Sequence, residues 1–204
     1  VCDAITKGIK INKSKLEIIS CPMADGGEGS IDIINNYLSL KPVELIVNDP
    51  LFRPIKTTYY FSDLTAYIEM SSASGLSLLK KEEQNCMNTS SFGTGELIKD
   101  AINKGLTTIN LYIGGSATND GGVGIASALG FQFYDRLKKQ LSPIGKNLKS
   151  IDHLFLHLRG LAYLMLSRLK EVLPCLKVRH TSFASLIHDF YSQQNKLLQI
   201  DLRY

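Results

Sequence analysis

The sequence of 204 residues predicts an α/β fold. The first observation is a strand–loop–helix pattern over residues 109–129, where an alternating apolar run precedes a glycine-rich loop and a helical run. The second is that residues 15–38 repeat this plan. The third is a change to consecutive β-rich runs at 54–61 and 66–70, which indicates a second lobe with a soft boundary near residue 50.

The chain begins with residues 1–10, where Cys2, Ile5 and Ile9 share one face of a predicted helix. Because a helix of an α/β protein usually follows a strand, we expect an initial strand, with any catalytic side chain at its end, to be missing from this sequence. Residues 15–21 are predicted to form a strand that ends at Pro22, since proline cannot donate to a β ladder.

The loop at 23–30 carries two carboxylates, Asp25 and Glu28, and Ser30 is predicted to cap the helix that follows. A turn aspartate and a first-turn acid are the commoner roles of such residues. Their place at the carboxyl end of a presumed parallel strand favours a ligand site instead, because open α/β sheets bind ligands there. A carboxylate in that position can hold Mg²⁺ or accept a proton.

The middle of the chain predicts a strand at 43–47 and the hairpin-like pair of strands given above. Residues 71–75 then supply three hydroxyls, including those of Ser72 and Ser74, as a solvated loop or as ligand contacts. A helix follows from about residue 94, with Thr94 as its N-cap and Gly105 just after its end. Capping explains most of this signal, and the exposed helix start is also a candidate phosphate site.

The loop at 114–124 has five glycines in eleven residues, which lets the backbone bend tightly and approach a ligand. The first turn of a helix has unpaired N–H groups and a partial positive charge, so phosphate or carboxylate is the expected guest. The alternative is a turn that merely caps a helix. The loop favours a ligand because it has more polar side chains than a turn requires: Ser116, Thr118, Asn119 and Asp120.

The composition excludes several classes of protein. A formal charge of +4 without a basic run gives no indication of nucleic-acid binding. No apolar stretch approaches twenty residues and no signal-peptide pattern is present, so neither a membrane nor export is indicated. Four separated cysteines favour reduced thiols in a cytoplasm. There is no Walker-type lysine loop, and all four histidines lie in the last 54 residues, which disfavours a Ser-His-Asp hydrolase.

Four segments resemble the bacterial type I glycerate kinase family. They are MADGGEG at 23–29, EMSSASGL at 69–76, SFGTGELI at 91–98 and GGSATNDGG at 114–122. Their order and spacing are similar to the family over residues 1–152, and the last motif is highly specific.

The resemblance implies ATP-dependent phosphorylation of D-glycerate with Mg²⁺. The 2-hydroxyl is the expected acceptor, and the 3-hydroxyl is the alternative. It also implies a Rossmann-like α/β domain, represented by residues 1–50, and a second α/β domain, represented by 51–152, both incomplete. A cytoplasmic enzyme is expected, and assembly as a homo-oligomer stays open.

The resemblance assigns the site residues as follows. Asp25 and Asp120 are the candidates for the catalytic base and for the Mg²⁺ ligand, in either order. The candidate substrate and nucleotide contacts are Gly26, Gly27, Glu28, Ser72, Ser74, Thr94, Gly114, Gly115, Ser116, Thr118, Asn119 and Gly121.

The sequence departs from the family at both ends. Family members are nearly twice as long and begin with a strand that ends in an Asp-Ser-Phe-Lys-like stretch. From His153 the pattern is lost: residues 153–204 contain one glycine, Gly160, and every histidine, which indicates a shifted reading frame, a degraded gene or a divergent tail. Residues 154–172 are predicted to form an amphipathic helix that Pro174 ends. A catalytically inactive remnant and an anion-binding module without turnover are therefore the alternatives to a kinase.

Overall fold

A computed structural model describes residues 2–12, 16–156 and 198–201. Their main sheet has the strand order β1-β2-β3-β4-β7. The strands are β1 (Lys41–Asn48), β2 (Pro54–Ser62), β3 (Thr65–Glu69), β4 (Thr108–Tyr112) and β7 (Leu198–Asp201). Among the described strands of this sheet, only β3 and β4 are parallel neighbours, because the segment between them crosses over through a helix. A separate antiparallel pair consists of β5 (Phe131–Tyr134) and β6 (His153–Leu156). The predicted α/β class is confirmed.

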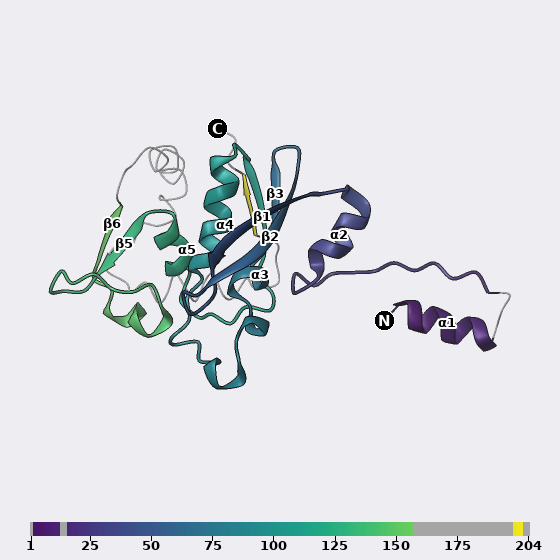
Figure 1. The fold of residues 1–204 in the computed structure, drawn as a ribbon, viewed down its shortest axis with the longest axis horizontal. Helices are drawn as coiled ribbons and strands as arrows, with labels where there is room; N and C mark the ends of the chain where they lie inside the picture. The colour runs from purple at the N-terminus through teal and green to yellow at the C-terminus, as the bar shows by residue number, and fades with distance from the viewer. Residues whose placement is uncertain (1, 13–15, 157–197, 202–204) are drawn as a thin grey trace.

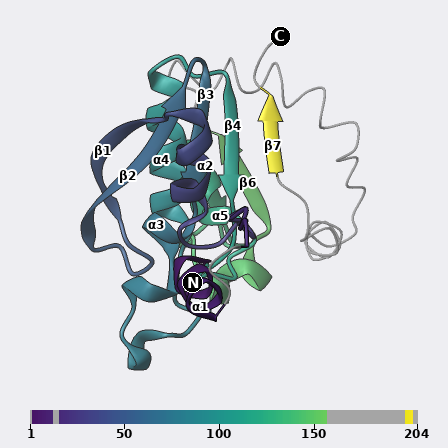
Figure 2. The same cartoon turned by 90° about the vertical axis from the view of Figure 1, so that its right-hand side faces the viewer.

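The helices lie on both sides of the main sheet, as Figures 1 and 2 show. They are α1 (Cys2–Asn12), α2 (Ser30–Leu38), α3 (Ser71–Ser74), α4 (Phe92–Asn103) and α5 (Val123–Ala128), with short 3₁₀ turns η1 (Leu76–Leu78), η2 (Lys81–Glu83) and η3 (Gly145–Ser150). In Figure 1, α1 and the segment after it extend away from the sheet, while β5 and β6 lie on the opposite side of the molecule.

The sheet has two apolar faces because successive side chains of a strand point in opposite directions. On β2, Tyr59 is buried in the larger cluster with Leu97 and Ile98 of α4, whereas Tyr60 packs against the smaller cluster that contains Ile31 of α2. Strand β4 does the same, with Ile109 and Leu111 on the α4 face and Tyr112 on the α2 face. The central strands are thus covered on both faces.

Two glycines let α4 approach its neighbours closely. A Cβ on Gly93 would lie 1.8 Å from the carbonyl oxygen of Asn48 in β1, and one on Gly95 would lie 2.7 Å from Ile125 Cα in α5. The Glu96 carboxylate completes the first junction by accepting from the Asn48 backbone N–H at 2.7 Å. The helix ends as predicted, with Gly105 in the left-handed region at φ +82°.

Several local predictions are wrong. Residues 16–25 form no strand: Leu16 and Ile19 are exposed, and no described strand pairs with them. Thr94 is the third residue of α4, and the N-cap is Ser91. The helix predicted from Leu154 begins instead as strand β6, which pairs with β5. The rest of that predicted helix, with Pro174, lies outside the described residues.

The boundary near residue 50 stays a prediction, and strands β1 and β2, which flank it, pair along their full length. Within the described residues, no helix is long and apolar enough to cross a membrane. Of the predicted reduced thiols, Cys21 and Cys86 are free and exposed.

Candidate functional site

The two glycine-rich loops predicted from the sequence are in direct backbone contact. The Gly114 N–H donates to the Gly26 carbonyl oxygen at 2.7 Å. A Cβ on Gly114 would lie 2.5 Å from Gly27 Cα, so a side chain at this position would push the loops apart. The structure therefore joins the MADGGEG and GGSATNDGG segments into one surface feature.

The loop at 25–28 presents its carboxylates to solvent. Asp25 is exposed, and its Oδ1 accepts from the Gly27 N–H at 2.8 Å, which closes an Asx turn. Glu28 is also exposed, and its Oε1 accepts from the Ser77 hydroxyl at 3.3 Å. Both acids can reach a ligand or a cation that approaches from solvent.

The start of α2 is capped by a carboxylate from another element. Gly29 is the N-cap residue, at φ +83°, and Ser30 makes no capping hydrogen bond, so its predicted capping role is wrong. Glu69, at the end of β3, accepts from the Ile31 N–H at 2.8 Å and from the Gly29 N–H at 3.4 Å. The first turn of α2 thus already holds a negative charge, as its dipole favours.

Asp120 lies inside the protein and is 2% exposed. Its Oδ2 accepts from the Ser91 N–H at 2.7 Å, from the Ser91 hydroxyl at 2.8 Å and from the Gly124 N–H at 3.1 Å. Its Oδ1 accepts from the Gly122 N–H at 3.0 Å. The same Ser91 hydroxyl accepts from the Ile125 N–H at 3.1 Å, so Asp120 and Ser91 tie the starts of α4 and α5 together.

Three further predicted contacts have internal partners. The Ser74 and Thr94 hydroxyls are 0% exposed and hydrogen-bond to each other at 2.7 Å, which joins α3 to α4. The Ser72 hydroxyl donates to the Glu69 carbonyl oxygen at 2.7 Å. These hydroxyls fix the local backbone in the structure, and their contact with a ligand stays a prediction.

The remaining predicted residues form the rim of the 114–122 loop. Gly115 is exposed at φ +72°, and Ser116 forms an isolated antiparallel bridge with Gly75. The hydroxyls of Ser116 and Thr118 are 2.8 Å apart. Asn119 is exposed and Gly121 half-buried.

The N–H groups at the helix starts already have acceptors within the protein, and the anion site predicted there stays a prediction. At α2 the N–H groups face Glu69, and at α5 they face Asp120 and Ser91. The start of α4 is buried rather than exposed. The sequence analysis missed Glu69 and Ser91 as the partners. Glu69 at the end of a strand and Ser91 just before a helix were the available signals.

Tyr112 lies beneath this region, at the end of β4 and in the cluster with Ile31. Burial raises the pKa of its phenol, and the neighbouring Tyr67 and Glu69 raise it further. The phenol therefore stays neutral at physiological pH and serves in packing.

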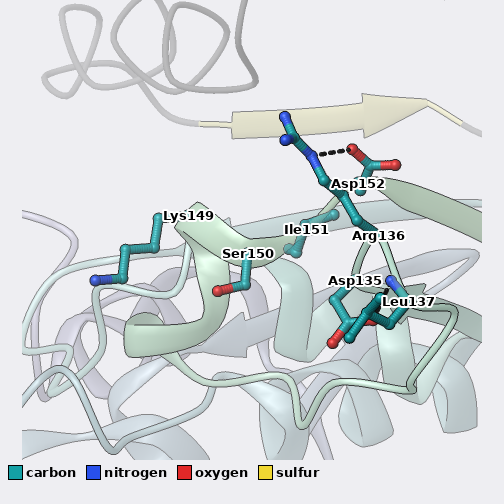
Figure 3. Close-up of a pocket in the computed structure, with 7 residues that line it drawn as sticks. All are labelled: Asp135, Arg136, Leu137, Lys149, Ser150, Ile151 and Asp152. Carbon is teal, nitrogen blue, oxygen red and sulfur yellow. Dashed lines mark hydrogen bonds and ion pairs between the residues drawn. The ribbon is translucent and has the colours of Figure 1, made fainter.

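A pocket of about 340 Å³ lies elsewhere, beside β5 and β6 (Figure 3). It is lined by Asp135, Arg136, Leu137, Lys149, Ser150, Ile151 and Asp152. Arg136 Nε lies 3.3 Å from Asp152 Oδ1, so part of its charge is already paired. None of the predicted site residues lines this pocket.

Comparisons with known proteins agree with the motifs. Residues 1–162 match the "Glycerate kinase family". Glycerate kinase of Haemophilus influenzae is 42% identical over 153 residues, which cover 74% of this chain and 40% of that protein. Glycerate 2-kinase of Escherichia coli is 37% identical over 154 residues, covering 74% of this chain and 40% of that protein.

A crystal structure from Salmonella typhimurium LT2, named as a glycerate kinase 2, superimposes with a TM-score of 0.62 at 34% identity. The match covers 74% of this chain and 41% of that one. The chain thus spans about 40% of the length of these curated relatives. The family match over most of the sequence and the similar fold lead to one conclusion: the chain belongs to the glycerate kinase family.

Proposed function

We propose that this protein phosphorylates D-glycerate with ATP, at the 2-hydroxyl, in a cytoplasm. The observation that carries the proposal is the backbone contact between Gly114 and Gly26, since it unites the two glycine loops that match the family. Phosphoryl transfer requires mainly that donor, acceptor hydroxyl and metal be held in line, so loops of fixed backbone geometry suit it.

The two aspartates differ in their fit to Mg²⁺. A magnesium ion keeps several waters and takes one or two carboxylates, and therefore needs an accessible oxygen. Asp25 is exposed and meets this requirement, and Glu28 is its exposed neighbour. Asp120 accepts four internal hydrogen bonds and is buried, so it does not fit a metal or a proton from substrate. When bound, Mg²⁺ neutralises charge on the transferring phosphoryl group.

In the proposed reaction the hydroxyl oxygen of glycerate forms a bond to the γ-phosphorus of ATP. The bond from that phosphorus to the bridging oxygen of ADP breaks, and the hydroxyl proton leaves for a base. Asp25 takes part either as this base or through the metal. Gly115, Ser116, Thr118 and Asn119 line the neighbouring rim and are the proposed contacts for the remaining substrate oxygens.

Two alternatives are separated by one set of measurements. D-Glycerate-dependent formation of ADP by the 204-residue chain, with phosphorus NMR of the product, tests the kinase and distinguishes 2- from 3-phosphoglycerate. Calorimetric binding of glycerate or ATP without turnover identifies an anion-binding module. Neither turnover nor binding identifies an inactive remnant.

We predict that Asp25→Asn lowers turnover without destabilising the fold. The asparagine oxygen can still accept the Gly27 N–H, so the midpoint of thermal unfolding should stay the same while kcat falls about 100-fold or more. Asp32→Asn is the matched control, because Asp32 is an exposed acid on α2. Near-normal kcat in Asp25→Asn would remove Asp25 from the mechanism.

A further inference from the structure

Glu69 occupies a position from which one side chain can influence both glycine loops. It is the last residue of β3 and pairs with Tyr112, the last residue of β4. The next N–H, of Met70, donates to the Tyr112 carbonyl at 2.8 Å, and the Ser72 hydroxyl donates to the Glu69 carbonyl. The Glu69 backbone is therefore fixed to the two strands, and β4 leads directly into the loop at 114–122.

The Glu69 side chain reaches in the other direction, to the loop at 25–29. This loop has no capping side chain of its own at the start of α2, because its N-cap is Gly29. The Glu69 carboxylate replaces that cap by accepting from both Gly29 and Ile31. A charged acceptor at a helix start forms a stronger bond than a neutral cap.

The two loops then meet at the Gly114 N–H and the Gly26 carbonyl oxygen. Only two residues lie between Gly26 and Gly29, so we expect a displacement of the helix start to reach this contact. Nearby Asp25 is the exposed carboxylate of the proposed reaction.

We infer that Glu69 is a positioning residue, which holds the acidic loop at 25–29 in register with Gly114 by capping α2 from β3. It touches neither substrate nor metal, and it acts through the position of Asp25. The statement that Glu69 acts through Asp25 rests on the proposed function.

The test compares Glu69→Ala and Glu69→Gln with Glu44→Gln. Glu44 is the matched control because its carboxylate is 61% exposed on β1 and pairs with Lys56 there. Amide hydrogen exchange is measured at Ile31, which Glu69 bonds directly, and at Gly114, which it does not. Glutamine keeps one acceptor oxygen, so its effect should be smaller than that of alanine.

In Glu69→Ala, exchange at both amides should accelerate about threefold to tenfold, the range that loss of a hydrogen bond gives. The KM for D-glycerate should rise as well, which a simple loss of folded protein does not produce because KM is independent of the active fraction. Glu44→Gln should change neither quantity. If Glu69→Ala fails to fold, Glu69→Gln provides the same readouts.

Unchanged Gly114 exchange with faster Ile31 exchange would overturn the inference, because Glu69 would then cap α2 without fixing the loop contact. An unchanged KM in an active chain would also overturn it. If the unsubstituted chain has no turnover, the proposed function fails, and exchange at Gly114 alone decides whether Glu69 positions the loops.

Discussion

At Gly114, the absence of a single carbon atom allows two loops from distant parts of the chain to touch. The atoms that a Cβ would meet belong to the backbone of Gly26 and Gly27, at 2.5–2.7 Å. Backbone atoms cannot rotate away as the end of a long side chain can. The contact therefore tolerates glycine and no larger residue.

We predict that Gly114→Ala destabilises the fold by about 1–3 kcal/mol, the usual cost of overpacking. It should also weaken glycerate binding, since the loops must separate. Chemical denaturation and calorimetry measure the two effects. Gly8→Ala is the matched control: Gly8 lies in helix α1 with nothing within 4 Å of its added Cβ. Its substitution should be neutral or stabilise the helix by up to about 1 kcal/mol. Equal stability of both variants would refute the close approach.

Asp120 illustrates a second effect at the residue scale, that of a buried charge with a full set of donors. Asp120→Asn places an NH₂ group where the carboxylate accepted from Ser91 and Gly124. We predict a loss of about 1–3 kcal/mol of stability, the cost of leaving buried donors without their acceptor. Thermal unfolding measures it, with the surface variant Asp25→Asn as the comparison. Loss of turnover with unchanged stability would instead assign Asp120 a direct chemical role.

At the element scale, a carboxylate from another part of the chain meets the starts of both α2 and α4. Glu69 caps α2, and Asp120 links α4 to α5. The sequence predicted these helices from their apolar spacing, and it predicted both loops from their glycines. It could not predict the Glu69 cap, because capping rules consider residues within one turn, whereas Glu69 lies 38 residues from Ile31.

The turn after β1 gives a prediction about pH. Arg53 pairs with Glu83 at 2.8 Å and also with the buried Asp49. The Lys80 N–H and then Arg53 lower the pKa of Glu83 from its ordinary value of 4.5. The folded state thus binds this proton more weakly than the unfolded state does. The stabilisation is therefore present above pH 4.5 and is lost as the pH falls through the lower folded value.

Glu83→Gln should therefore lower the thermal midpoint at neutral pH, and its difference from the unsubstituted chain should shrink below pH 4.5. Calorimetric scans across this range measure the difference. Glu82→Gln, one residue earlier and exposed, is the matched control. A difference that is constant with pH would mean that the Glu83 carboxylate does not contribute through its charge.

At the scale of the whole molecule, the α/β class and the two glycine-rich loops follow from the sequence, because glycine and alternation are local signals. The backbone contact between Gly114 and Gly26 joins distant parts of the chain, and the sequence did not predict it. The failure at residues 16–21 has a different cause. These residues have the apolar content of a strand, but a strand exists only when a neighbour accepts its hydrogen bonds, and no described strand does. At the start of α2, the acceptor of the N–H groups is the carboxylate of Glu69, a residue distant in the sequence, so the helix pattern alone could not identify it.

Residues 1–24 lie outside the core clusters of the described residues, so their removal should cost little stability. Leu16, Ile19 and Met23 are exposed, and neither core cluster of the described residues includes any residue before Ile31. Their removal should therefore leave cooperative unfolding intact, with a midpoint shift within about 4 °C, the shift that about 1 kcal/mol gives. Ile31→Ala is the comparison, since Ile31 is 4% exposed in the cluster under α2 and its truncation should cost about 2–5 kcal/mol. Differential scanning calorimetry measures both. A truncated chain that loses as much stability as Ile31→Ala, or that unfolds without a sharp transition, would show that the first residues belong to the cooperative core.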